Sequence, residues 1–194
     1  MKIIGLTGGI GSGKSTILKM FQELGAVAYI ADVEAKELMN TNRELIQQIK
    51  QLFGEKAYKN NELNRTYLSE VVFNDKEKLV ALNKIIHPKV REHFKAFILK
   101  STAEIIIYES AILFESGSDS MCNFIITVVV NLEDRIKRVM ERDGTTKQQI
   151  ENRIKNQLDD DFKIKRAHFV IKNNTLKDTK LQVDTIHQLI LTQL

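Results

Sequence analysis

Short apolar runs alternate with longer segments of mixed polar and apolar residues along the 194-residue chain. Five runs predict strands, and they span residues 2–6, 27–30, 104–108, 124–130 and 168–172. Residues 105–107 and 125–130 are β-branched and continuous rather than alternating, as in strands that are buried on both faces. Segments 15–24, 43–53, 77–86 and 177–192 repeat apolar side chains at helical spacing and predict amphipathic helices. This alternation predicts an α/β fold with a parallel five-stranded sheet flanked by helices.

Residues 33–100 depart from the alternation, because this long segment between the second and third strands is mostly helical. We interpret it as a helical insertion attached to the sheet. A length of 194 residues suits one domain, so the prediction is a single domain over residues 1–194 that contains the insertion.

Composition narrows the class of protein. No run of about 18 apolar residues occurs, which excludes a transmembrane helix. The apolar start is too short for a secretory signal, so we expect a cytoplasmic protein without a membrane partner. Cys122 is the one cysteine, which excludes an internal disulfide and a multi-cysteine zinc site, and we expect it to be a packing residue.

The formal net charge of +4 is compatible with nucleic acid or with a small polyanionic substrate. No block of five or more basic residues and no zinc-finger spacing occurs. The sequence therefore favours small polyanions and predicts no nucleic-acid partner.

The strongest motif is Gly-Gly-Ile-Gly-Ser-Gly-Lys-Ser at residues 8–15, which matches the phosphate-binding P-loop. A predicted strand precedes it and a predicted helix follows. Glycines let backbone N–H groups converge on phosphate oxygens, and the helix directs its positive dipole end at the same anion. Lys14 is expected to reach the β- and γ-phosphates, and Ser15 to ligate Mg²⁺. The loop predicts a nucleotide phosphate site without specifying a reaction.

Carboxylates follow two of the predicted strands, where ligands bind in parallel sheets. Asp32 follows the second strand and fits a general base for an alcohol that attacks the γ-phosphate, but a helix N-cap fits equally well. Glu109 follows the third strand, where it is either near the water shell of Mg²⁺ or a solvated helix cap.

Arg135, Arg138 and Arg142 are spaced to lie on one face of a helix. A helical lid over residues 135–165 could bring such arginines to a transferring phosphoryl group and exclude water. Ordinary ion pairs on an exposed helix are the alternative. We interpret the acidic run at residues 159–161 as a solvated turn or helix cap.

The chain resembles the dephospho-CoA kinase family over nearly its whole length. The resemblance rests on residues 4–16, Ala31-Asp32, His87-Pro88, Leu-Phe-Glu-Ser-Gly at 113–117, the segment 138–144, Arg153-Ile154 with Gln157, and Val170-Ile171 with Asn173. It implies a P-loop kinase fold, with a helical substrate-binding insertion at about 33–100 and a lid at about 135–165. It also implies that ATP and dephospho-CoA are the substrates. Ile30 departs from the family pattern, which often has a second aspartate there.

The resemblance assigns roles residue by residue. The ATP-phosphate site corresponds to Gly11, Ser12, Gly13, Lys14, Ser15 and Thr16. Asp32 corresponds to the general base toward the ribose 3′-hydroxyl, and Arg142 to a lid arginine near the phosphates. Asp32 and His87 are predicted to contact the substrate, with catalysis by Asp32, Lys14 and Arg142. Our preferred structural interpretation of His87-Pro88 is a turn between two helices, with Pro88 starting the second.

Two other functions stay open. One is a P-loop kinase for another acceptor, such as a nucleotide or a small alcohol. The other is a nucleotide-dependent switch, which is disfavoured because Asn131-Leu132-Glu133-Asp134 lacks the lysine of a guanine-reading motif.

Overall fold

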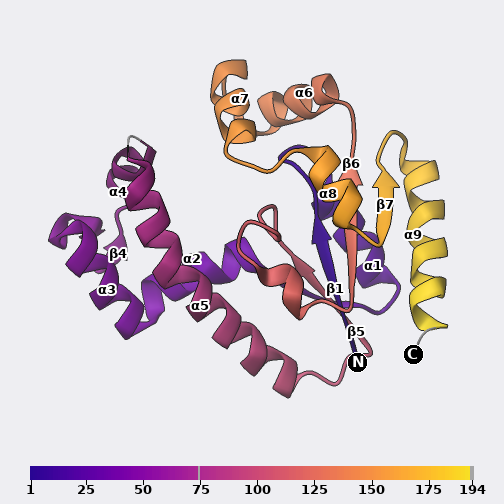
Figure 1. The fold of residues 1–194 in the computed structure, drawn as a ribbon, viewed down its shortest axis with the longest axis horizontal. Coiled ribbons are helices and arrows are strands. Elements are labelled where there is room, and N and C mark those ends of the chain that lie inside the picture. Colours follow the sequence, from indigo (N-terminus) through magenta and orange to yellow (C-terminus); the bar gives the residue numbers. More distant parts are fainter. Residues whose placement is uncertain (74, 193–194) are drawn as a thin grey trace. The chain divides into compact units, whose positions relative to one another are not determined.

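The computed structural model describes residues 1–73 and 75–192, and the chain divides into two compact units (Figure 1). The sheet unit comprises residues 1–30 and 102–194, and the helical unit comprises residues 31–101. Among the described residues, no helix is long and apolar enough to cross a membrane. The role of the helical unit as a substrate-binding insertion stays a prediction.

The sheet unit is built on five strands that pair in parallel in the order β2-β5-β1-β6-β7. Its elements are β1 (Lys2–Thr7), α1 (Lys14–Glu23), β2 (Val27–Ile30), β5 (Ile105–Glu109), β6 (Phe124–Val129), α6 (Leu132–Asp143), α7 (Lys147–Lys155), α8 (Asp160–Arg166), β7 (Phe169–Lys172) and α9 (Leu176–Leu191). The predicted parallel five-stranded α/β fold is confirmed, and each predicted strand lies within one residue of its observed bounds.

Helices α1 and α9 cover one face of the sheet, as Figure 1 shows beside β1 and β7. Their apolar side chains join the strand residues in one core cluster, whose members include Ile4, Leu6, Ile17, Phe21, Ile126, Val183 and Ile190. Alternate strand residues face the other side, where Tyr29 stacks on Tyr108 with ring centroids 5.4 Å apart. The unit therefore buries both faces of its sheet, which explains the continuous apolar strands.

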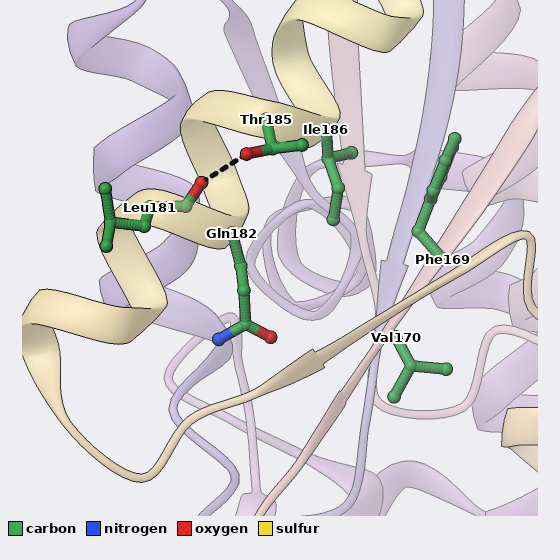
Figure 2. A pocket seen from close by; sticks show the side chains of 6 residues that line it. All are labelled: Phe169, Val170, Leu181, Gln182, Thr185 and Ile186. Atoms are coloured by element: carbon green, nitrogen blue, oxygen red, sulfur yellow. Dashed lines mark hydrogen bonds between the residues drawn. The ribbon is translucent and has the colours of Figure 1, made fainter.

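Strand β7 forms one edge of the sheet, and α9 closes part of that edge. The Gln182 side chain accepts from the Lys172 N–H at 2.9 Å and donates to the Lys172 carbonyl at 3.1 Å. Both backbone groups are thus satisfied without another strand. Figure 2 shows the hollow between these elements, where the Thr185 hydroxyl donates to the Leu181 carbonyl. It is lined by Phe169, Val170, Leu181, Gln182, Thr185 and Ile186.

The helical unit contains α2 (Ala31–Thr41), α3 (Arg43–Phe53), β3 (Tyr58–Lys59), β4 (Glu62–Leu63), α4 (Arg65–Phe73) and α5 (Lys76–Lys100). Helices α2, α3 and α4 all pack on α5. The two short strands form an antiparallel hairpin whose turn holds Asn60 and Asn61 at positive φ. The predicted helix 43–53 is confirmed at its observed bounds.

Helix α5 corrects the prediction of a turn at His87-Pro88. Its 25 residues continue through Pro88, which lies inside the helix. The proline removes one backbone N–H, but an apolar stripe of Leu82, Ile86, Val90 and Phe94 continues on one face of the helix from before the proline to beyond it. Burial of this stripe against the other helices outweighs the local cost of the proline. The predicted helix 77–86 is therefore only the first part of a longer one.

Candidate nucleotide phosphate site

The phosphate loop connects β1 to α1 at the carboxyl edge of the sheet. Gly8, Gly11 and Gly13 adopt φ of 147°, 78° and 93°, a range that side chains with a Cβ rarely adopt. Neighbours add a second requirement, because a Cβ on Gly8 would lie 2.4 Å from the Val128 carbonyl oxygen. Gly8 is thus needed both for the turn and for close packing against β6.

The loop leaves the start of α1 open. Gly13 precedes the helix and supplies no side-chain cap, and the first turn contains no acidic residue. By contrast, a side chain caps α3, α5, α6, α7, α8 and α9. The start of α1 therefore has neither a side-chain cap nor an acidic residue that would compete with an external anion, which the helix dipole attracts.

Lys14 lies folded back over the loop. Its Nζ donates to the Gly8 carbonyl at 3.0 Å and lies 3.7 Å from Oε1 of Glu109, at the end of β5. Both side chains are largely buried, with exposed fractions of 11% and 13%. The structure thus brings a cation and a carboxylate together beside the loop, and Glu109 joins the predicted residues of the site.

Two buried hydroxyls lie near the loop. Within the described residues, the side-chain oxygens of Thr7 and Ser12 have no hydrogen-bond partner. A Cβ on Gly8 would lie 2.8 Å from Ser12 Oγ, so this hydroxyl turns toward the inside of the loop. Ser15 is exposed in the first turn of α1, and Thr16 is half-buried beside it.

Asn173 holds the loop from the end of β7, and sequence reasoning gave it no role here. Its Nδ2 donates to the Ser12 carbonyl at 2.8 Å, and its Oδ1 accepts from the Thr179 hydroxyl at 3.0 Å. A Cβ on Gly13 would lie 2.0 Å from the same Nδ2. Asn173 follows a parallel strand at its carboxyl end, and this position is the signal that could have identified it.

The three arginines of α6 have different surroundings, although their spacing placed them on one face. Arg135 is buried and donates to the loop carbonyl of Ile10 at 3.0 Å. Arg138 donates to the Asn173 carbonyl at 3.2 Å, and its Nη1 is 3.7 Å from the position of a Cβ on Gly13. These two arginines therefore lie beside the phosphate loop.

Arg142, the arginine predicted to be catalytic, is exposed at the end of α6. Its Nε donates to Asp143 at 2.7 Å, and this bond raises the pKa of Arg142 and lowers that of Asp143. Arg153 also pairs with Asp143, at 3.3 Å. Arg142 thus belongs to a group of ion pairs at the surface, together with Asp143 and Arg153. Its catalytic role stays a prediction.

The acidic run at residues 159–161 proves to have two roles. Asp159 caps α8 by accepting from the Phe162 N–H, as expected of a helix cap. Asp160 instead pairs with buried Arg135, with 2.7 Å between Oδ2 and Nη1. The interpretation as a solvated turn or cap is therefore incomplete for Asp160, because its carboxylate pairs with a buried arginine 25 positions away.

Lys163 anchors α8 to the Leu-Phe-Glu segment. Its side chain is fully buried, with Nζ 3.3 Å from the Ala111 carbonyl and 3.6 Å from Oε1 of Glu115. Burial lowers the pKa of Lys163, and the nearby Glu115 carboxylate opposes that shift. The same Glu115 oxygen accepts from the Leu158 N–H at 2.8 Å. Glu115 thus holds the segment that connects α7 with α8.

Asp32 and His87 belong to the helical unit. Asp32 is exposed in the first turn of α2, which begins directly after β2. His87 is half-buried in α5, where burial first and then the charge of Arg91 lower its pKa. The lowered pKa favours the neutral imidazole, and the predicted contact of His87 with the substrate stays a prediction.

These features define a P-loop protein with an α/β fold and an open phosphate site. The family model of CoaE, dephospho-CoA kinase, matches residues 2–178. The chain belongs to the dephospho-CoA kinase family, as the resemblance in its sequence predicted.

Relatives and solved structures agree with this family. A dephospho-CoA kinase of Fusobacterium nucleatum is 43% identical over 174 residues, which cover 89% of this chain and 90% of the relative. A crystal structure from Thermus thermophilus has a TM-score of 0.86 at 32% identity and covers 100% of this chain and 97% of that one. A dephospho-CoA kinase structure from Campylobacter jejuni has a TM-score of 0.69 at 29% identity, with 97% and 96% covered.

Proposed function

We propose that this chain transfers the γ-phosphoryl group of ATP to the ribose 3′-hydroxyl of dephospho-CoA, which yields coenzyme A and ADP. Membership of the dephospho-CoA kinase family carries the choice of acceptor. The open, glycine-lined start of α1 carries the choice of a nucleotide phosphate as the other ligand. The net charge of +4 suits two polyanionic substrates, and we propose a cytoplasmic location.

Backbone N–H groups of residues 11–16 and the Lys14 ammonium would hold the ATP phosphates. Lys14 is held near the loop by Gly8 and Glu109, so a phosphate oxygen that displaces these partners receives a positioned charge. A preorganised cation costs little reorganisation as negative charge shifts toward the leaving oxygen of ADP. Arg138 adds a second cation beside Gly13.

Mg²⁺ fits the oxygen donors at this site. No group of three or more metal-ligating His, Cys, Asp or Glu occurs among residues 1–73 and 75–192. Mg²⁺ is usually held by one or two protein oxygens together with substrate phosphates and water. Ser15 Oγ would be a direct ligand, and the Glu109 carboxylate would hold its water shell. When bound, Mg²⁺ neutralises phosphate charge.

Asp32 would act on the acceptor. Its exposed carboxylate, in the first turn of α2, can accept a hydrogen bond from the 3′-hydroxyl and take its proton as the oxygen attacks phosphorus. His87 would contact the same substrate as a neutral hydrogen-bonding group. Arg142 would stabilise the transferring phosphoryl group if the end of α6 reaches it during turnover.

An acceptor screen tests the proposal. Purified protein is given ATP and Mg²⁺ with dephospho-CoA, nucleoside monophosphates, shikimate or gluconate, and ADP release and product mass are recorded. We expect turnover with dephospho-CoA alone, no turnover with EDTA, and recovery with excess Mg²⁺. The Lys14→Ala protein, prepared in the same way, controls for contaminating kinases. Preference for another acceptor would contradict the proposal, and nucleotide binding without any transfer would favour a switch.

A further inference from the structure

Ile10 occupies the outer turn of the phosphate loop, and distant residues take both of its backbone groups. Its N–H donates to Oε1 of Gln157 at 3.0 Å, and its carbonyl accepts from Nε of Arg135 at 3.0 Å. These partners lie 147 and 125 positions away in the chain. A surface turn would normally give such groups to water. Here Arg135 of α6 and Gln157, in the connection between α7 and α8, take these groups instead.

The side chain of Ile10 makes a third connection. Helices α6 and α7, which we call the α6–α7 hairpin (residues 132–155), have a small core of their own that is formed by Ile136, Val139 and Ile150. Ile10 and Ile154 are the two half-buried side chains that pack against this core. One residue of the phosphate loop therefore completes the apolar core of the hairpin. This small core is separate from the main core that the strands form with α1 and α9.

Arg135 strengthens this connection. Its side chain is only 6% exposed, and its Nη1 pairs with Asp160 Oδ2 at 2.7 Å. A Cβ on Gly9 would lie 2.0 Å from Arg135 Nη2, and one on Gly11 would lie 2.8 Å from a Val139 methyl group. Three consecutive loop residues therefore touch α6. Breaking a buried ion pair is costly, so the guanidinium is held in one place.

We propose that Ile10 is a positioning residue that couples the phosphate loop to the α6–α7 hairpin. A nucleotide that orders the loop then also orders the hairpin, and a loosened hairpin weakens nucleotide binding by the same free energy. The inference rests on the proposed function only in assigning nucleotide phosphates to the loop. Ile10 itself touches no reacting atom in this account.

Ile10→Ala tests the coupling, with Ile154→Ala as its matched control. Both remove the same atoms from the same small core, but only Ile10 belongs to the loop. We measure ADP affinity by calorimetry and ADP-induced protection of hairpin amides by hydrogen exchange. Ile10→Ala should weaken ADP binding at least about fivefold, the lower end of typical coupling between sites, and reduce the protection. Ile154→Ala should lower the melting temperature with a smaller change in both readouts.

Two further variants keep the test informative if Ile10→Ala folds poorly. Ile10→Val retains a branched apolar side chain and should keep ADP affinity within about twofold of wild type. Arg135→Met removes the donor to the Ile10 carbonyl and should weaken ADP binding in the same direction as Ile10→Ala. The ADP affinities of all variants are measured at a temperature at which each variant is as fully folded as wild type, as judged by circular dichroism.

One pattern would overturn the coupling: equal losses of melting temperature in Ile10→Ala and Ile154→Ala, with ADP affinity and hairpin protection unchanged in both. Ile10 would then be a packing residue only. None of these measurements needs an acceptor, so a failed acceptor screen leaves them intact. If wild-type protein does not bind ADP at residues 9–16, the coupling and the proposed function both fail.

Discussion

Within the sheet unit, helices α1, α6 and α9 each follow a strand of the parallel sheet along the chain, and the start of α1 differs from the other two. At α6, Asn131 Oδ1 accepts from the Asp134 N–H at 2.8 Å, and at α9, Thr175 Oγ1 accepts from the Asp178 N–H at 3.1 Å. Both helices also have acidic residues in the first turn. Helix α1 has neither feature and begins with Lys14 after Gly13.

The difference teaches what an open helix start is for. Every helix has unpaired N–H groups and a positive dipole at its first turn. At α6 and α9, a side chain of the chain itself accepts from one of these groups, which stabilises the fold. At α1 no side chain caps the helix, and the Lys14 ammonium lies beside the loop. The same physical feature at the same edge of the sheet can therefore stabilise the fold or, as we propose for α1, bind phosphate.

Lys14→Ala should have the largest effect, because it removes the cation from the open start. Loss of one preorganised group that stabilises developing charge typically lowers kcat by about 100- to 1,000-fold. The measurement is steady-state ADP release, with circular dichroism to confirm folding. Lys19→Ala, at an exposed lysine of the same helix, is the matched control. Wild-type turnover in Lys14→Ala would refute the assignment of the phosphate site.

Asp32→Asn should follow, with kcat lowered about 100-fold and little change in KM for dephospho-CoA. The amide keeps the size of the side chain but cannot take the proton of the 3′-hydroxyl. Glu34→Gln, in the same first turn of α2, is the control and should change kcat little. If Asp32→Asn changes only the melting temperature, Asp32 is a helix-terminal acid and not a base.

Ser15→Asp would give α1 the acidic first turn that α6 and α9 already have. Without ligand, the carboxylate should raise the free energy of unfolding by about 0.3–1 kcal/mol, through the helix dipole. With ADP, like charges should weaken binding at least about tenfold. Chemical denaturation and calorimetry measure these opposite changes. Ser15→Ala separates the added charge from the lost hydroxyl, and equal changes in both variants would argue against an open anion site.

Arg142→Ala is expected to lower kcat about tenfold while ATP affinity is retained, if the exposed end of α6 reaches the phosphoryl group. Arg153→Ala is a matched control, since both arginines pair with Asp143. A specific loss in Arg142→Ala supports its catalytic role. Equal and small effects in the two variants would contradict a catalytic role for Arg142 and leave Arg138, closer to the loop, as the α6 arginine that serves the phosphates together with Lys14.

Thr175→Ala should have the smallest effect on activity. Loss of the cap at α9 should cost about 1 kcal/mol of unfolding free energy, with kcat and KM within about twofold of wild type. Denaturant unfolding and steady-state kinetics measure the two quantities. A kinetic loss larger than the loss at Ser15 would contradict the division between closed and open helix starts.

Most of the fold could be predicted because the local pattern and the tertiary structure agree. The strands β1, β5 and β6 are continuous apolar runs, and burial on both faces requires that composition. The glycines of the phosphate loop were visible for the same reason, since positive φ limits the choice of residue. Pro88 misled the prediction, because its local preference opposes a stripe buried by other helices.

The sequence by itself determined the strands of the sheet and their parallel arrangement, the phosphate loop and the family to which the chain belongs. Only the tertiary structure decided which side chains surround that loop. Arg135, Gln157 and Asn173 reach it from 125, 147 and 161 positions away. Helical spacing predicted that the α6 arginines share one face. In the structure, however, Arg135 is buried and pairs with Asp160, whereas Arg142 is exposed and pairs with Asp143. Such contacts depend on how distant segments pack, which no local pattern encodes.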